Sequence, residues 1–221
     1  MIYLLLVASV MVGATLYLLF QAKFQPHLNT ILTLSGGFLL AVTLREMLPE
    51  SYASLGEQAA FWVVVGWLIQ IVIEFFSQGF EHGHIRHFTE QKGRIVITAL
   101  LVHAIFDGIP ARSHPHFLYA VLLHKVPISC MLVGLLVRER VSKMQLILSL
   151  GLFAAAAPLG AYLDTLSWFV KNQMVILATA SGVFLHISAT ILLESSGKYH
   201  QIKWVKAIAL LIGLALGLID L

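Results

Sequence analysis

Long apolar runs, separated by short polar connections, set the pattern of this chain. Each run is close to the 17 to 25 residues that a helix needs to cross a bilayer. They occupy residues 1–20, 31–49, 60–77, 95–110, 117–137, 145–163, 175–193 and 205–221. The connections leave no room for a soluble domain. The pattern therefore predicts an all-α, polytopic integral membrane protein in which residues 1–221 form one bundle of eight transmembrane helices.

Composition supports this class. The 221 residues are 59% hydrophobic and 11% charged, against about 25% charged residues in ordinary soluble domains. Residues 1–20 lack the basic start and the small-residue cleavage site of a signal peptide, so we expect them to remain as the first helix. The single cysteine, Cys130, excludes an intrachain disulfide and is expected to pack.

The distribution of Lys and Arg predicts the orientation. Connections 1–2, 3–4, 5–6 and 7–8 carry Lys23, Arg86, Lys92, Arg94, Arg138, Arg140, Lys143, Lys198, Lys203 and Lys206. The connections on the other side carry only Arg112 and Lys171. By the positive-inside rule the first side is cytoplasmic and both termini lie outside. Topology thus explains the net charge of +3 without a nucleic acid partner, and these basic residues can meet anionic lipid.

Ionisable residues gather in the centre of the chain, within residues 100–134. A charged side chain at the bilayer centre costs about 2.5 to 3.5 kcal/mol on insertion scales, so such a cluster indicates a functional site. His103 and Asp107 are four residues apart and share one helix face. Pro110 and Pro115 bracket a turn that brings His124 back on an adjacent antiparallel helix. We therefore expect these two histidines and the aspartate to form a metal site rather than to hydrogen-bond between helices.

Two imidazoles and one carboxylate favour Zn²⁺, with Fe²⁺, Mn²⁺ and Cd²⁺ as further candidates. Three protein ligands leave a coordination position open, as transport requires, because a closed site would hold its ion too tightly. His186, in the middle of the seventh run, could complete the ligand set or simply pack. The expected bundle thus contains a transport site that takes the metal ion as its substrate.

Two further groups lie outside this centre. Arg45 and Glu46 are adjacent near the outer end of the second run and point about 100° apart on a helix. We therefore expect them to face different partners rather than each other. Either both lie at the membrane interface, or Glu46 stands at the outer mouth of a cation path. His82, His84 and His87 lie in the polar connection 78–94. This His-containing cytoplasmic segment either binds metal weakly and transiently or is a solvated loop.

Short motifs stand in five of the apolar runs. The fourth run holds a His followed four residues later by Asp-Gly, in His103, Asp107 and Gly108, and the fifth holds H-K-x-P. The sixth holds P-L-G-A, and the second and seventh hold SGGFLLA with LPES and SGVFL with LLES. Together these motifs resemble the ZIP (Zrt-, Irt-like protein) family of divalent metal transporters, whose fifth-helix pattern is H-[EK]-x-P-E. The resemblance implies eight helices, both termini outside, and zinc-preferring import into the cytoplasm by alternating access.

The chain also departs from the family pattern. Many members bind a second metal ion through an Asn after the fourth-helix His and acids on the fifth helix, where this chain has Ala104, Lys125 and Ile128. The resemblance therefore implies a variant without the second-metal ligands. Lys125 stands where the second ion would lie, as a tethered cation, with Asp107 as its nearest acid and Glu46 as the next.

Three classes of function follow from these features. The first is a divalent metal transporter, not an enzyme, in a bacterial inner membrane and as a monomer or homodimer. The second is a non-transporting metal sensor of the same fold, which the missing second site favours. The third is an intramembrane metal-dependent hydrolase, against which the absence of H-E-x-x-H counts.

Overall fold

The computed structural model describes residues 1–20, 25–77, 90–195 and 204–219, and these residues contain helices and no strand. The elements are α1 (Ile2–Phe20), α2 (Gln25–Val42), the π-helical turn η2 (Thr43–Met47), α3 (Leu48–Leu55), α4 (Gln58–Ser77), α5 (Glu90–Ala111), α6 (Pro115–Arg138), α7 (Lys143–Leu163), α8 (Ser167–Lys171), α9 (Gln173–Ser195) and α10 (Trp204–Leu218). The all-α class predicted from the apolar runs is confirmed.

Within the described residues, seven helices are long and apolar enough to cross a membrane. They coincide closely with the first seven apolar runs, so the protein has the helices of a membrane protein. The eighth run forms α10, which is apolar but has only 15 residues. At 1.5 Å per residue it is about 22 Å long, shorter than the roughly 30 Å hydrocarbon core.

The second helical span extends beyond the predicted end at residue 49. It runs from His27 to Leu55 as α2, η2 and α3. Pro49 lies in the first turn of α3, where its missing N–H is tolerated. A π-helical turn directly precedes it and changes the hydrogen-bonding pattern there. The predicted apolar run 31–49 therefore ends six residues before the helix does.

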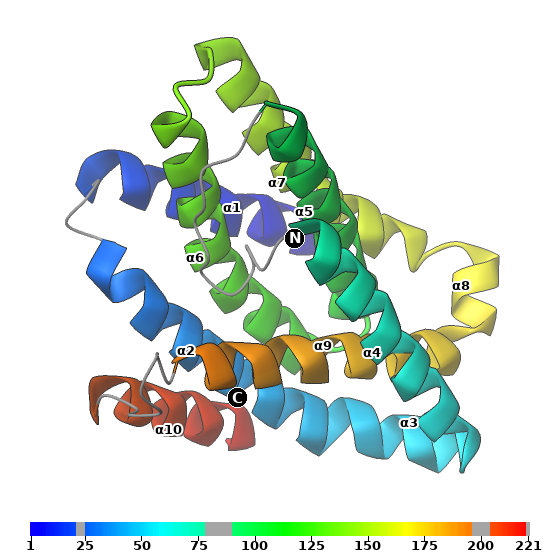
Figure 1. The fold of residues 1–221 in the computed structure, drawn as a ribbon. Coiled ribbons are helices and arrows are strands. Elements are labelled where there is room, and N and C mark those ends of the chain that lie inside the picture. The colour runs from blue at the N-terminus through cyan, green and yellow to red at the C-terminus, as the bar shows by residue number, and fades with distance from the viewer. Residues whose placement is uncertain (21–24, 78–89, 196–203, 220–221) are drawn as a thin grey trace.

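The helices pack mainly in pairs: α2 with α10, α4 with α9, α5 with α7, and α1 with α6. Figure 1 shows α10 alongside α2, and α5 and α7 running beside each other. Helix α6 is the most buried, with 78% of its apolar span inside the protein. The core of the bundle therefore surrounds α6, which carries His124 and Lys125.

Glycine sets the spacing between α5 and α7. A Cβ atom at Gly108 would lie 2.0 Å from the carbonyl oxygen of Ala157, and one at Gly160 would lie 2.1 Å from that of Ile105. Only residues without a side chain allow this approach. The close contact fixes the position of α5, the helix that carries His103 and Asp107.

Replacing Gly160 by alanine should destabilise the bundle, because its methyl group would meet a backbone carbonyl that can move only with α5. Overpacking of this kind costs about 1 to 3 kcal/mol. Gly151→Ala on the same helix is the matched control, since a Cβ there meets nothing within 4 Å. Thermal unfolding of both purified variants measures the effect. Equal melting temperatures would show that α7 does not depend on this contact.

Candidate metal site

The three residues predicted as metal ligands lie together in the protein interior. His103 and Asp107 project from α5 and His124 from α6, and each is at most 1% exposed. His103 Nε2 lies 3.5 Å from Asp107 Oδ1. The rings of His103 and His124 are 6.1 Å apart between centroids and inclined by 72°. The turn at residues 112–114 therefore brings the two histidines side by side, as the sequence predicts.

Lys125 forms a buried ion pair with Asp107. Its Nζ donates a hydrogen bond of 2.9 Å to Asp107 Oδ2, and the same Nζ lies 5.2 Å from the centroid of the Phe153 ring. Lys125 itself is fully buried. A buried charge is tolerated when it is paired, so each partner offsets the charge of the other. The expectation that Asp107 is the acid nearest to Lys125 is confirmed.

Several ligand atoms of this cluster have no hydrogen-bond partner within the described part of the chain. They are Nδ1 and Nε2 of His103, Nε2 of His124 and Oδ1 of Asp107. Buried polar atoms in native proteins are nearly always paired, so a group of exceptions calls for a specific explanation. Nitrogen and oxygen atoms of this kind are the ones that ligate Zn²⁺. A cation bound between these atoms would give each of them a partner.

The spacing of the atoms fits this explanation only in part. Two atoms that each lie about 2.0 to 2.1 Å from a tetrahedral zinc are about 3.3 to 3.4 Å apart, close to the 3.5 Å between His103 Nε2 and Asp107 Oδ1. However, no three His, Cys, Asp or Glu side chains in the described ranges are arranged so that they could hold a metal ion. Because Lys125 takes one oxygen of Asp107, a metal ion would have to displace it.

Ser35 on α2 orients His124. Its hydroxyl donates to the carbonyl of Leu32 at 2.9 Å, so it is available as an acceptor for His124 Nδ1, 3.5 Å away. A proton on Nδ1 leaves the lone pair on Nε2, which is one of the unpartnered atoms. Metal-ligating histidines are commonly held by such a bond from their second nitrogen. In the sequence, Ser35 stands only within the motif SGGFLLA, and nothing there links it to His124.

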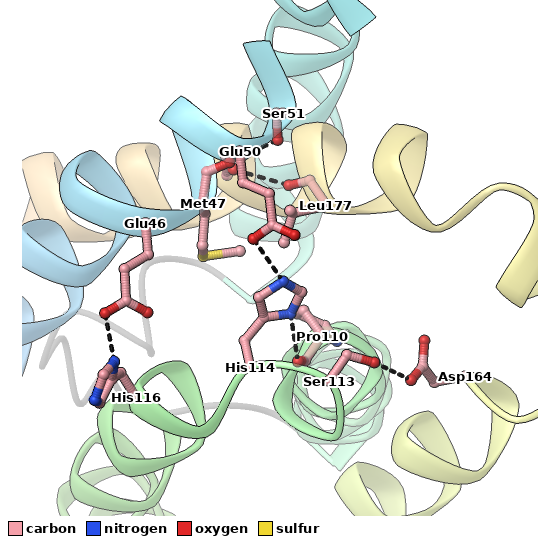
Figure 2. Close-up of polar contacts among 11 residues, drawn as sticks. Glu46, Met47, Glu50, Ser51, Pro110, Ser113, His114, His116, Asp164 and Leu177 are labelled. Carbon is pink, nitrogen blue, oxygen red and sulfur yellow. Dashed lines mark hydrogen bonds and ion pairs between the residues drawn. The ribbon is translucent and has the colours of Figure 1, made fainter. Parts of the chain in front are cut away.

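A second polar group lies where α5 ends and α6 begins. His116 Nδ1 lies 2.5 Å from Glu46 Oε1, and His114 Nε2 lies 3.1 Å from Glu50 Oε2. Figure 2 shows both histidines facing the glutamates of η2 and α3, with Ser113 turned toward Asp164. Arg45 instead donates to the carbonyl of Leu218 at 2.8 Å. The prediction that Arg45 and Glu46 contact different partners is confirmed.

His114 uses both ring nitrogens in these contacts. Nδ1 lies 3.2 Å from the carbonyl oxygen of Pro110, which only accepts, so Nδ1 carries a proton. Nε2 faces the carboxylate of Glu50, and this contact also requires a proton, on the imidazole or on the acid. The pair of His114 and Glu50 therefore joins α3 to the turn before α6 through one hydrogen bond.

Glu50→Gln should weaken this contact, because a neutral amide replaces the carboxylate. With Glu50 partly exposed, we expect a loss of about 0.5 to 1 kcal/mol in stability. Glu57→Gln is the control, since Glu57 lies just after the end of α3 and is exposed. Chemical unfolding at neutral pH measures the difference. A loss of the same size in both variants would contradict a specific role for the pair.

His186 does not complete the ligand set. Its Nε2 lies 2.5 Å from Glu74 Oε2 on α4, and its ring packs edge-on against Trp67 at 5.3 Å. Among the described residues it joins no group of three that could hold a metal. The structure thus places His186 in a separate polar contact between α4 and α9. The sequence contains both residues of this pair, but nothing in it links them.

The remaining predicted site residues, His82, His84 and His87, lie outside the described residues. The other predicted residues fall into three places in the bundle: the buried cluster of α5 and α6, the contact of Glu46 with His116, and the pair of His186 with Glu74. No protein-family model matches this sequence, and no curated protein matches it.

Proposed function

We propose that this protein is a ZIP-like transporter that imports a divalent transition metal, Zn²⁺ by preference, into the cytoplasm. The observation that carries the proposal is the set of unpartnered ligand atoms on His103, Asp107 and His124. These residues face one another on helices long and apolar enough to cross a membrane. Ionisable side chains within membrane-spanning helices cost free energy to insert, and they commonly mark ion pathways. The proposal includes eight membrane spans and both termini outside.

Movement of the ion follows from the contacts of Asp107. Lys125 holds one carboxylate oxygen in the absence of a metal ion, so the arriving cation replaces the ammonium group and the histidine nitrogens complete its shell. When the ion leaves, Lys125 returns to Asp107. In alternating access, the helices around such a site rock so that it opens first to one side and then to the other.

Glu46 and Glu50 place carboxylates near the turn at residues 112–114, which is the outer end in the expected topology. They would raise the local concentration of cations where the ion enters. The pair of His186 and Glu74 lies in the inner half of α4 and α9 in the same topology. In this proposal, these groups line the path on either side of the central cluster.

The buried pair of Lys125 with Asp107 also favours a second candidate, a non-transporting metal sensor. In a sensor, exchange of the ammonium group for a metal ion would change the contact between α5 and α6 without moving the ion across. No observation in the described residues favours a hydrolase.

Zinc uptake and zinc binding together test the proposal. The purified protein is reconstituted into liposomes that enclose a zinc-sensitive dye, and the metal content of the same preparation is measured after dialysis. His124→Ala should lose both binding and uptake, while His27→Ala, on the exposed start of α2, serves as the matched control. Binding without uptake identifies the sensor. Absence of both in the wild-type protein contradicts both candidates.

Changing His82, His84 and His87 together to alanine should reduce the initial rate of zinc uptake by no more than about half. A short His-rich tract without cysteines or fixed ligand spacing binds metal weakly, so the membrane cluster sets the affinity. Uptake into liposomes at several zinc concentrations measures the rate. Complete loss of uptake by the folded triple variant would show that this connection is essential.

A further inference from the structure

A cavity of about 570 Å³ opens where α5 begins, α6 ends and α7 begins. It lies at the end of the bundle opposite to the polar contacts in Figure 2, because the chain reaches those contacts at the other ends of α5 and α6. It therefore lies apart from the metal cluster. Its size is in the range of 300 to 1,000 Å³ that is usual for ligand pockets.

The lining changes from polar to apolar along the helices. Arg94 on α5 and Gln145 on α7 line the cavity at the end of the bundle. Arg140, from the turn between α6 and α7, lines it there as well. Ile97 lies about 4.5 Å further along α5 and Leu152 about 10.5 Å further along α7, at 1.5 Å per residue. A ligand that fits this cavity has a charged head and an apolar tail in the same order.

The charge of the polar end is positive. Arg94 and Arg140 line the cavity with one acid, Glu139, and Arg138 and Lys143 lie beside it in the sequence. The planar guanidinium group binds phosphate through two parallel hydrogen bonds. Basic pockets between membrane helices are suited to the headgroups of anionic lipids.

Arg140 occupies a position that favours glycine. It follows the last turn of α6 with φ of 52°, and the backbone there closes with Arg140 N to Val137 O and Val141 N to Leu136 O. This is the Schellman arrangement, in which the left-handed residue is usually glycine. Any residue with a Cβ atom is disfavoured there relative to glycine. An arginine at such a position is consistent with a task for its side chain.

We propose that this cavity binds one anionic phospholipid, with its phosphate on Arg94 and Arg140 and the start of an acyl chain along Ile97, Leu148 and Leu152. Leu148 and Leu152 are each 57% exposed, so a lipid tail would cover apolar surface that faces the bilayer. The site stands independently of metal transport, because none of its residues belongs to the metal cluster.

Native mass spectrometry of the delipidated protein in detergent tests this proposal. Phosphatidylglycerol and phosphatidylcholine with the same acyl chains are titrated separately, and the occupancy of the first bound lipid is measured. The wild-type protein should bind phosphatidylglycerol at least about tenfold more tightly. Both lipids carry the phosphate, but the choline cation of phosphatidylcholine is repelled by Arg94 and Arg140, whereas phosphatidylglycerol is a net anion. Equal binding of the two lipids would overturn the proposal.

Three variants locate the site. Arg140→Gly removes the guanidinium group and also suits the left-handed backbone, so the protein should fold at least as well while its preference for phosphatidylglycerol falls about tenfold. Gly93→Leu fills the cavity, since a Cβ at Gly93 meets nothing within 4 Å, and should have the same effect. Arg138→Gln removes one charge from the same end of the protein but not from the lining, and should bind normally.

Glycerol phosphate, which lacks acyl chains, separates a lipid site from a site for a soluble anion. We expect no competition with phosphatidylglycerol at millimolar concentrations, because the apolar lining contributes to binding. Full competition would assign the cavity to a soluble phosphate compound and overturn the lipid proposal. A preference for phosphatidylglycerol that survives both Arg140→Gly and Gly93→Leu would place lipid binding elsewhere and also overturn it.

Discussion

His103→Ala, Asp107→Ala and His124→Ala should each lower zinc affinity by at least about 100-fold. Loss of residues that merely orient a ligand already costs 10- to 100-fold, and these three residues supply the ligand atoms themselves. All three are buried, so water has little access to replace a missing ligand. Equilibrium dialysis against a zinc buffer, followed by elemental analysis, measures the affinity.

His186→Ala and His27→Ala are the controls for this series. His186 contacts Glu74 rather than the cluster, and His27 lies on the exposed start of α2. Both should retain zinc binding within a few fold of the wild-type affinity. If one of the three cluster variants binds zinc normally, its residue is not a ligand. If His186→Ala removes binding, the ion is held between α4 and α9 instead.

Much of the fold was predictable because membrane helices need continuous apolar length. The helix α6 (Pro115–Arg138), for example, differs from the predicted run 117–137 by only a few residues. Its break from α5 was predicted from Pro110 and Pro115, and the turn lies at residues 112–114. The second span was predicted less well, because the apolar run ends at residue 49 whereas the helix continues to Leu55. Nothing in the local sequence indicates the π-helical turn that carries the helix past residue 49.

The cluster itself was predictable where its geometry is local. His103 and Asp107 are one turn apart on a helix, so their spacing brings them together. Lys125 follows His124 directly and therefore lies at the same depth, although about 100° further around the helix. Contacts between distant helices were not predictable in the same way. Ser35 reaches His124 from α2, and Glu74 reaches His186 from α4. These pairings depend on how the helices pack, which a single sequence does not specify.

Lys125→Met should destabilise the metal-free protein and strengthen its response to zinc. Methionine preserves most of the side-chain volume but removes the ammonium group, leaving the Asp107 carboxylate buried without its cation. Breaking a buried ion pair from one side costs about 3 to 5 kcal/mol. Zinc restores the missing positive charge and no longer competes with Lys125. Thermal unfolding with and without zinc should therefore show a larger zinc-dependent increase in melting temperature than in the wild-type protein.

Lys171→Met, at the end of α8, is the control for the loss of a lysine and should leave both melting temperatures unchanged. A folded Lys125→Met protein with wild-type zinc affinity would show that the ammonium group does not compete with the metal.

Lys125→Glu replaces the tethered cation by a second carboxylate beside Asp107. Metal content after dialysis should then rise from one zinc per chain toward two, and further when Ile128→Glu is added. A folded double variant that still binds a single zinc would mean that Lys125 does not stand at the place of a second ion.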